Sequence, residues 1–188
     1  MSQFELLKEV VRFLTSSDIP YMLTGSIVSS FQGEPRSTHD IDMMILLKKE
    51  NIPSFIQSFS SPIYYVDEDR VLNAIQFRKM FNLLNTMTGD KVDFYILPEN
   101  DYEITRFKRK IQENINGMMF WITTPEDTIL SKLRWCKLSN NSEKQFKDAL
   151  RVFEIQYDIL DFTYIQEWIT ELNLGDLYRR LQVEREDL

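Results

Sequence analysis

The chain has 188 residues, 43% of them apolar, and its 29 Asp and Glu residues outnumber its 22 Lys and Arg residues, which gives a formal net charge of −7. This length and apolar content allow one sizeable core with an appended subdomain, and the negative charge argues against broad attraction to nucleic acid, which depends on Lys and Arg at phosphates. No uninterrupted apolar run exceeds five residues and Cys136 is the single cysteine, so the composition predicts a cytoplasmic protein without a membrane span, a secretion signal or an intramolecular disulfide.

The first part of the chain is predicted to alternate helices with strands. Phe4, Leu7, Val11 and Leu14 recur at helical spacing and indicate an opening helix, which the turn-rich residues 16–20 end. Expected after it are a strand ending at Gly25, a short helix from Ser26 to Gly33, a strand over DIDMMILL, a helix over residues 52–59 and a short strand over residues 63–66.

The middle of the chain contains the clearest hairpin pattern. In FNLLNTMTGDKVDFYIL, two β-type runs flank a Thr-Gly-Asp turn, and the second run contains Asp93. Expected next are a helix over 102–112, a strand over MMFWIT, a helix over 125–137 capped by Thr124, and further helices over 143–157, 164–172 and 176–185. We therefore predict an α+β domain over residues 1–123 and a C-terminal helical subdomain over residues 124–188.

Asp40 and Asp42 stand at the start of the strand DIDMMILL. Side chains alternate along a strand, so both carboxylates project to one side while the intervening apolar side chains project to the other. Two adjacent anions repel each other, and a divalent cation such as Mg²⁺, which prefers oxygen ligands, would stabilise the pair. A solvated loop edge is the alternative. An EF-hand calcium loop is excluded, because Met44 and Ile45 stand where such a loop needs an oxygen ligand and Gly.

The residues around this acidic pair form a more specific pattern than the pair itself. It consists of Gly25-Ser26 opening a helix, Arg36 and Thr38 before Asp40-Ile41-Asp42, and Asp93 on a later strand. The pattern resembles that of the DNA-polymerase-beta-type nucleotidyltransferase superfamily. The segment R-S-T-H-D-I-D is further similar to the motif of AbiEii-type toxins and related stand-alone nucleotidyltransferases. The resemblance implies a nucleotidyltransferase-type mixed sheet with flanking helices, followed by a C-terminal helical region.

The same resemblance implies an enzyme dependent on Mg²⁺ or Mn²⁺ that transfers a nucleoside monophosphate from an NTP such as ATP to a hydroxyl group. The acceptor would be a small molecule, a protein or an RNA end, with tRNA as one candidate. A toxin-like role would bring an antitoxin protein as partner. The alternative is a nucleotidyltransferase-fold protein that binds a nucleotide or a partner without catalysis. The carboxylates favour the enzyme, because a binding module has no need for three anions that repel one another.

The resemblance assigns the catalytic and metal-binding roles to Asp40, Asp42 and Asp93. Asp93 would act on the incoming hydroxyl, either through a metal ion or as a base. Without the other two, Asp93 fits an exposed hairpin position equally well. In AbiEii-type proteins a Lys and an Asp from the helical half complete the site. Lys132 and Asp148 match them here, and the sequence leaves open whether Asp148 takes part.

Nucleotide-binding roles are predicted for Gly25, Ser26, Arg36, Thr38 and Lys132. Gly25 lets the backbone approach a triphosphate, and Ser26 at a helix start offers a hydroxyl and free N–H groups, although a simple turn into a helix cap is the alternative for this pair. Arg36 is expected either to bind phosphate or to pair with a carboxylate, and Thr38 to shape its loop. Lys132 borders the apolar arc of its predicted helix and is expected to reach a phosphate.

Overall fold

The computed structural model describes residues 2–38, 40–60 and 62–186, which form two compact units. Within these limits the first unit consists of Met1–Thr24 and Thr38–Ile122, and the second of Gly25–Ser37 and Thr123–Leu188. Each unit has buried apolar side chains of its own. None of the helices among the described residues is long and apolar enough to span a membrane.

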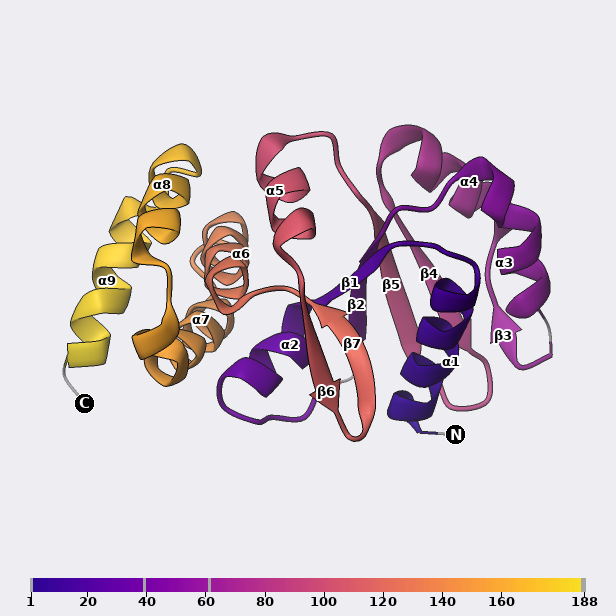
Figure 1. Ribbon diagram of the computed structural model, residues 1–188, viewed down its shortest axis with the longest axis horizontal. Coiled ribbons are helices and arrows are strands. Elements are labelled where there is room, and N and C mark those ends of the chain that lie inside the picture. Colours follow the sequence, from indigo (N-terminus) through magenta and orange to yellow (C-terminus); the bar gives the residue numbers. More distant parts are fainter. Residues whose placement is uncertain (1, 39, 61, 187–188) are drawn as a thin grey trace. The chain divides into compact units, whose positions relative to one another are not determined.

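The first unit is built on one mixed sheet, whose seven strands in the described part of the chain run in the order β3-β4-β5-β2-β1-β7-β6 (Figure 1). β2 pairs in parallel with β5 and β1 with β7, whereas the other neighbours are antiparallel. The predicted mixed sheet is therefore confirmed. Its strands are β1 (Tyr21–Thr24), β2 (Asp40–Ile45), β3 (Tyr64–Tyr65), β4 (Met80–Asn85), β5 (Lys91–Ile96), β6 (Ile111–Ile115) and β7 (Met118–Ile122).

One face of this sheet carries the core of the first unit. Ile41 of β2 and Phe94 of β5 point into it and are fully buried. The helices α1 (Gln3–Ser16) and α3 (Ile52–Ser58) supply the opposing layer, and the ring centroid of Phe55 in α3 lies 5.5 Å from that of Phe94. Because apolar side chains take every second position along β2 and β5, the polar side chains between them face the other side of the sheet.

The other sheet face is covered at one end by α5 (Asp101–Arg109). Phe107 of this helix packs against Met22 of β1 and Met44 of β2. The helix begins after Asn100, whose side chain accepts a hydrogen bond from the Glu103 backbone N–H and so satisfies one of the free donors of the first turn. The remaining helical segments of this unit are η1 (Lys49–Asn51) and α4 (Glu68–Phe77).

The second unit is helical in its described residues, which confirms the predicted C-terminal helical region. Its core includes Phe146 and Phe153, which lie on one side of α7 and are almost completely buried. Thr124 caps α6 by accepting from the Asp127 backbone N–H, as the sequence pattern Thr-Pro-Glu-Asp predicts. The helices are α2 (Gly25–Gln32), α6 (Pro125–Leu138), α7 (Glu143–Gln156), η2 (Tyr157–Ile159), α8 (Phe162–Glu171) and α9 (Gly175–Glu186).

Close backbone packing attaches α2 to the helices of the second unit. Gly33 follows its last turn, and a Cβ at this position would lie 2.9 Å from the Ser29 carbonyl oxygen and 3.0 Å from the Val152 nitrogen. The buried side chain of Gln32 donates from Nε2 to the Thr123 carbonyl oxygen at 2.7 Å. Segment Gly25–Ser37 belongs to the second compact unit together with Thr123–Leu188, and the division into domains 1–123 and 124–188 stays a prediction.

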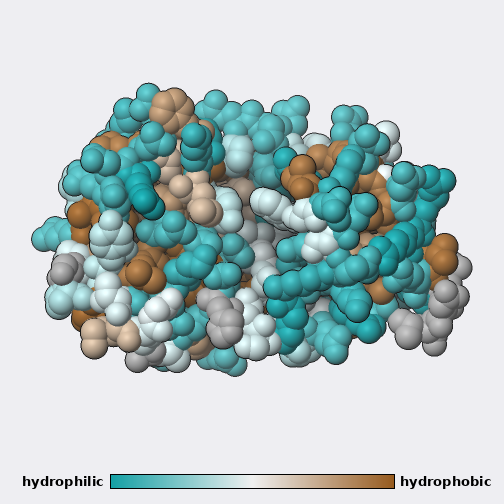
Figure 2. Space-filling model, turned by 180° about the vertical axis from the view of Figure 1, so that it is seen from behind, coloured by the Kyte–Doolittle hydropathy of each residue, from teal (hydrophilic) through white to brown (hydrophobic). Residues whose placement is uncertain are grey.

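The face seen in Figure 2 is mostly hydrophilic, and its apolar side chains form separate patches rather than one continuous surface. The high proportion of charged residues, 27% of the chain, accounts for this appearance. Large exposed apolar side chains nevertheless occur in both units, among them Met119 and Trp121 in the first and Trp135 and Leu138 in the second. Scattered apolar side chains of this kind are normal on folded proteins.

Most of the predicted elements are confirmed, with ends that shift by one or two residues. The predicted helix over 102–112 is wrong at its end, because α5 stops at Arg109 and β6 pairs with β7 from Ile111 onward. The two strands are joined at Asn116 and Gly117, whose φ angles are 51° and 82°. An Asn-Gly pair with positive φ is typical of a tight hairpin, so this signal was present in the sequence. The helix α4 was not predicted.

Candidate active site

The three predicted carboxylates lie on one face of the sheet in the first unit. Asp40 and Asp42 belong to β2, and Asp93 belongs to β5, its parallel neighbour. The register places Asp42 directly beside Asp93 and Asp40 beside Lys91. Because side chains at alternate positions share a face, these four residues all project away from the apolar core. The structure thus brings the predicted carboxylates together on neighbouring strands.

Lys91 and Asn82, which the sequence reasoning missed, hold the Asp93 carboxylate from both sides. The Lys91 ammonium group lies 3.0 Å from Asp93 Oδ2 and 3.3 Å from Asp40 Oδ1. Asn82 faces Asp93 from the antiparallel strand β4 and donates from Nδ2 to Asp93 Oδ1. The side chain of Asp93 is only 9% exposed, whereas that of Asp40 is 54% exposed. Asp93 is therefore a buried and fixed carboxylate, and Asp40 faces solvent.

The charges of this cluster alter the pKa values of two neighbouring side chains. Burial, together with the negative charges of Asp42, Asp93 and Asp40, raises the pKa of Tyr95 to about 12, and the tyrosine also shares a hydrogen bond with Asp42. The hydrogen bond to Asp93 raises the pKa of Lys91 above its ordinary value. Lys91 therefore stays protonated and Tyr95 stays neutral at physiological pH, so the surroundings of the carboxylates have a fixed protonation state.

The donor chemistry of this cluster fits a divalent cation. Asp40 and Asp42 offer the hard carboxylate oxygens that Mg²⁺ and Mn²⁺ prefer, and the Lys91 ammonium already lies between two carboxylates. Within the described residues, no group of three Asp, Glu, His or Cys side chains is gathered closely enough to hold a metal ion. The predicted metal-binding role of Asp40, Asp42 and Asp93 stays a prediction, and the side chain of Asp40 is exposed to solvent.

Arg106, an arginine from α5, lies next to the acidic face. Arg106 donates from Nη2 to Thr24 Oγ1 at 2.7 Å and pairs with Glu103 at 3.2 Å. Thr24 is the last residue of β1 and stands beside Asp42 in the β1–β2 register. Arg106 is 6% exposed. Lys108 and Arg109 follow on the same helix, so the sequence shows only an ordinary charged helix. The fold is what distinguishes Arg106 from these neighbours.

The predicted nucleotide-binding residues fall mainly in the second unit. Gly25 opens α2 with φ of 70°, in the left-handed region that glycine adopts without strain. Ser26 follows it in the first turn of the helix. Thr38, in contrast, belongs to the first unit, where its hydroxyl donates to the Asp40 carbonyl oxygen at 3.4 Å. His39, which lies within the quoted motif, is outside the described residues.

Arg36, Lys132 and Asp148 form a compact ion cluster in the second unit. Arg36 donates two hydrogen bonds to the Asp148 carboxylate, of 2.9 Å from Nε and 2.7 Å from Nη2. Lys132 Nζ lies 2.7 Å from the same carboxylate. Ser26 Oγ accepts from Arg36 Nη2 at 3.1 Å and from Lys132 Nζ at 3.5 Å. Two cations, one hydroxyl and one helix start thus share one small region, and Asp148 holds the cations in position.

The electrostatic balance at Asp148 favours its charged form. Burial by itself raises the pKa of Asp148, but the hydrogen bonds from Arg36 and Lys132 outweigh it and hold the pKa below its ordinary value. The same hydrogen bond raises the pKa of Arg36. Of the two readings of Arg36 that the sequence allowed, its contact with a carboxylate is observed. The partner comes from α7, and no local sequence spacing predicts that pairing.

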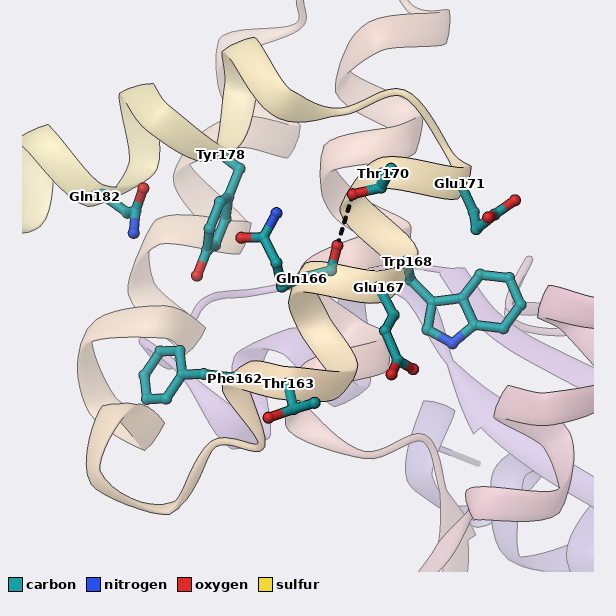
Figure 3. A pocket seen from close by; sticks show the side chains of 9 residues that line it. All are labelled: Phe162, Thr163, Gln166, Glu167, Trp168, Thr170, Glu171, Tyr178 and Gln182. Carbon is teal, nitrogen blue, oxygen red and sulfur yellow. Dashed lines mark hydrogen bonds between the residues drawn. The ribbon is translucent and has the colours of Figure 1, made fainter.

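The second unit also contains a groove between α8 and α9. Its volume is about 940 Å³, and it is lined by Phe162, Trp168 and Tyr178 together with the polar side chains of Gln166 and Glu167 (Figure 3). The hydroxyl of Thr170 turns back onto its own helix, as the dashed line in the figure shows. The groove contains none of the predicted site residues.

No protein-family model and no curated protein matches the sequence. Solved structures do resemble it. ANT(2'')-Ia in complex with adenylyl-2''-tobramycin shares 10% identity at a TM-score of 0.59, over 92% of this chain and 98% of that one. The chain has a nucleotidyltransferase fold. A nucleotidyltransferase-like protein from Paracoccidioides brasiliensis shares 17% identity at a TM-score of 0.55, over 96% of this chain and 92% of that one. The lincosamide adenylyltransferase LnuA, bound to lincomycin, shares 14% identity at a TM-score of 0.54, over 79% and 95% of the two chains.

Proposed function

We propose that this protein is a metal-dependent nucleotidyltransferase, which moves a nucleoside monophosphate from an NTP to a hydroxyl acceptor. The observation that carries the proposal is the β2–β5 register, which places Asp40, Asp42 and Asp93 on one face of a sheet with the nucleotidyltransferase fold. Carboxylates that share one sheet face repel one another, and a bound cation or a ligand offsets that repulsion. The cluster therefore supports an enzyme over a protein that merely has this fold.

In the proposed reaction the acceptor oxygen forms a bond to the α-phosphorus while the bond from that phosphorus to the β-phosphate bridging oxygen breaks, and pyrophosphate leaves. Asp93 accepts the proton of the acceptor hydroxyl and passes it to solvent. Its carboxylate keeps one orientation because Asn82 and Lys91 contact its two oxygens. Asp40 and Asp42 would hold the divalent cation, which when bound neutralises charge on the phosphates.

The ion cluster of the second unit is proposed to bind phosphate oxygens. Arg36 presents a planar set of N–H donors and Lys132 a point charge, both suited to phosphate. Ser26 adds a hydroxyl, and the positive end of α2 adds free backbone N–H groups. Asp148 would keep both cations ordered and partly neutralised when no nucleotide is present, which supports a positioning role rather than a chemical one.

Two classes of acceptor are candidates. ANT(2'')-Ia and LnuA were solved with adenylyl-2''-tobramycin and lincomycin respectively, which makes a small antibiotic one candidate acceptor. The AbiEii-like resemblance of R-S-T-H-D-I-D makes a toxin-like enzyme acting on tRNA, controlled by an antitoxin, the second candidate. The cytoplasmic location remains a prediction from composition.

The deciding experiment incubates the protein with each of the four α-labelled NTPs in Mg²⁺ or Mn²⁺. Acceptor pools are added separately: aminoglycosides, lincosamides, total tRNA and purified protein. Wild-type protein should release pyrophosphate and label one pool, whereas Asp42→Asn should do neither while it still binds a nonhydrolysable NTP. Nucleotide binding with no transfer to any pool, in either metal, would favour the catalytically inactive alternative.

A further inference from the structure

Lys91 occupies the space between two of the proposed catalytic carboxylates. Its ammonium group lies 3.0 Å from Asp93 Oδ2 and 3.3 Å from Asp40 Oδ1. The backbone places Lys91 on the same sheet face as both carboxylates, since Lys91 is two residues before Asp93 on β5 and directly beside Asp40 in the parallel register. A lysine ammonium has three donors and can serve both carboxylates at once.

The contacts of Asp93 leave it poorly arranged to share a metal ion with the other two carboxylates. Lys91 contacts one of its oxygens and Asn82 donates to the other. The side chain is 9% exposed, against 54% for Asp40. A two-metal site, in contrast, needs ions about 3.5–4 Å apart and carboxylates that bridge them.

We propose that Lys91 takes the place of the second divalent cation in this enzyme. The site then binds a single divalent ion through Asp40 and Asp42, while Lys91 neutralises Asp93 and fixes its orientation as the base for the acceptor hydroxyl. Lys91 is a positioning residue in this scheme, because it acts through Asp93. The inference rests on the proposed function and decides between the two roles that the sequence left open for Asp93, metal ligand or base.

The charges of the cluster support this assignment. Asp40, Asp42 and Asp93 together carry three negative charges, and Lys91 with one divalent ion supplies three positive charges. A second divalent ion beside the ammonium would add like-charge repulsion at the same carboxylates. Lys91 carries a positive charge near neutral pH, as an ordinary lysine does. Replacing it by a neutral side chain frees the two carboxylates for a metal ion.

The test counts metal ions rather than turnover. Equilibrium dialysis against Mn²⁺ and a nonhydrolysable ATP analogue gives the Mn²⁺ retained per chain. Wild type and Lys91→Arg should each retain about one ion, whereas Lys91→Met and Lys91→Gln should retain about two. Lys79→Met is the matched control, because Lys79 is an exposed lysine that lies over the Phe77 ring, and it should retain the same number as wild type.

Metal-free thermal melting provides the second measurement. Lys91→Met should melt at a lower temperature than wild type without metal, because its carboxylates repel, and Mn²⁺ should raise its melting temperature more than it raises that of wild type. Retention of about two ions by wild type, or of about one by both neutral variants, overturns the inference and leaves the proposed function standing. Failure of wild type to retain any Mn²⁺ while it binds the analogue refutes metal-dependent transfer itself, and the inference with it.

Discussion

Asp148→Asn should destabilise the second unit, because two cationic side chains lose the anion that they share. The carboxylate of Asp148 accepts two hydrogen bonds from Arg36 and one from Lys132, at 2.7–2.9 Å. The side chains of Asp148 and Lys132 are only 9% and 6% exposed. Asparagine keeps the shape of the side chain but removes its charge and one acceptor oxygen, so it isolates the electrostatic contribution.

The expected loss can be worked out from this burial. Breaking a buried ion pair by removing one partner costs about 3–5 kcal/mol, because the remaining charge is left uncompensated. Arg36 is 29% exposed and can turn partly toward water, which lowers the expected loss to about 2–4 kcal/mol. A loss of about 3 kcal/mol corresponds to a fall in melting temperature of about 6–12 °C for a chain of this length.

The same substitution should change how stability depends on pH. The pKa of Asp148 is lower in the folded protein than its unfolded value of about 3.9. A depressed pKa means that the stabilisation is fully present above the unfolded pKa and is lost as the pH falls through the folded pKa. The difference in unfolding free energy between wild type and Asp148→Asn should therefore be constant from about pH 5 to pH 8 and shrink below about pH 4.

Urea denaturation followed by far-ultraviolet circular dichroism measures both quantities. Asp176→Asn is the control, because Asp176 also forms an ion pair with an arginine, but its side chain is 93% exposed. Its loss of unfolding free energy should therefore stay below about 0.5 kcal/mol. Equal free energies of unfolding for the two variants at pH 7 would refute the argument that burial makes the Asp148 cluster stabilising. A difference between wild type and Asp148→Asn that grows in acid would refute the assigned direction of the pKa shift.

Three further predictions concern the rest of the site and its support. Lys132→Ala should weaken binding of a nonhydrolysable NTP by about 1.5–3 kcal/mol, the worth of a charge-assisted hydrogen bond, in calorimetric titration with Mg²⁺; equal affinities would restrict Lys132 to its ion cluster. Asp42→Asn should abolish metal-dependent transfer and leave the metal-free melting temperature equal or higher, because repulsion is relieved; a large drop would make Asp42 structural. Gly33→Ala should lower the free energy of unfolding, measured in urea, by about 1–3 kcal/mol, because its Cβ would lie 2.9 Å from Ser29 O and 3.0 Å from Val152 N. Unchanged stability would show that α2 and α7 can move apart without cost.

Local patterns in the sequence were sufficient for most elements and for the acidic face. Asp40 and Asp42 share a side because alternation in a strand is a property of the backbone, independent of the rest of the fold. The start of α6 at Thr-Pro could also be predicted from the sequence, because a helix cap involves only neighbouring residues. The hairpin at Asn116-Gly117 was equally local and was overlooked because the preceding charged run continues a helical pattern.

Other features could not be read from local patterns. Lys91 was two residues from a predicted catalytic carboxylate, yet its importance depends on the parallel register that sets it beside Asp40. Asp148 lies on the polar side of its own helix in sequence, and it becomes buried only because Arg36 and Lys132 come from segments 112 and 16 residues away. Asn82 likewise acquires its contact with Asp93 through the pairing of β4 with β5.

The sequence by itself determined the strand and helix pattern, the sidedness of the acidic pair, and a resemblance that named the fold. These follow from periodicity and from short-range steric preferences, which act within a few residues. Only the tertiary structure decided which charges meet: Lys91 between Asp40 and Asp93, and Asp148 between Arg36 and Lys132. The physical reason is that an ion pair between distant segments depends on strand register and helix packing. Register and packing are set by the burial of apolar side chains across the whole unit, and no local pattern encodes them.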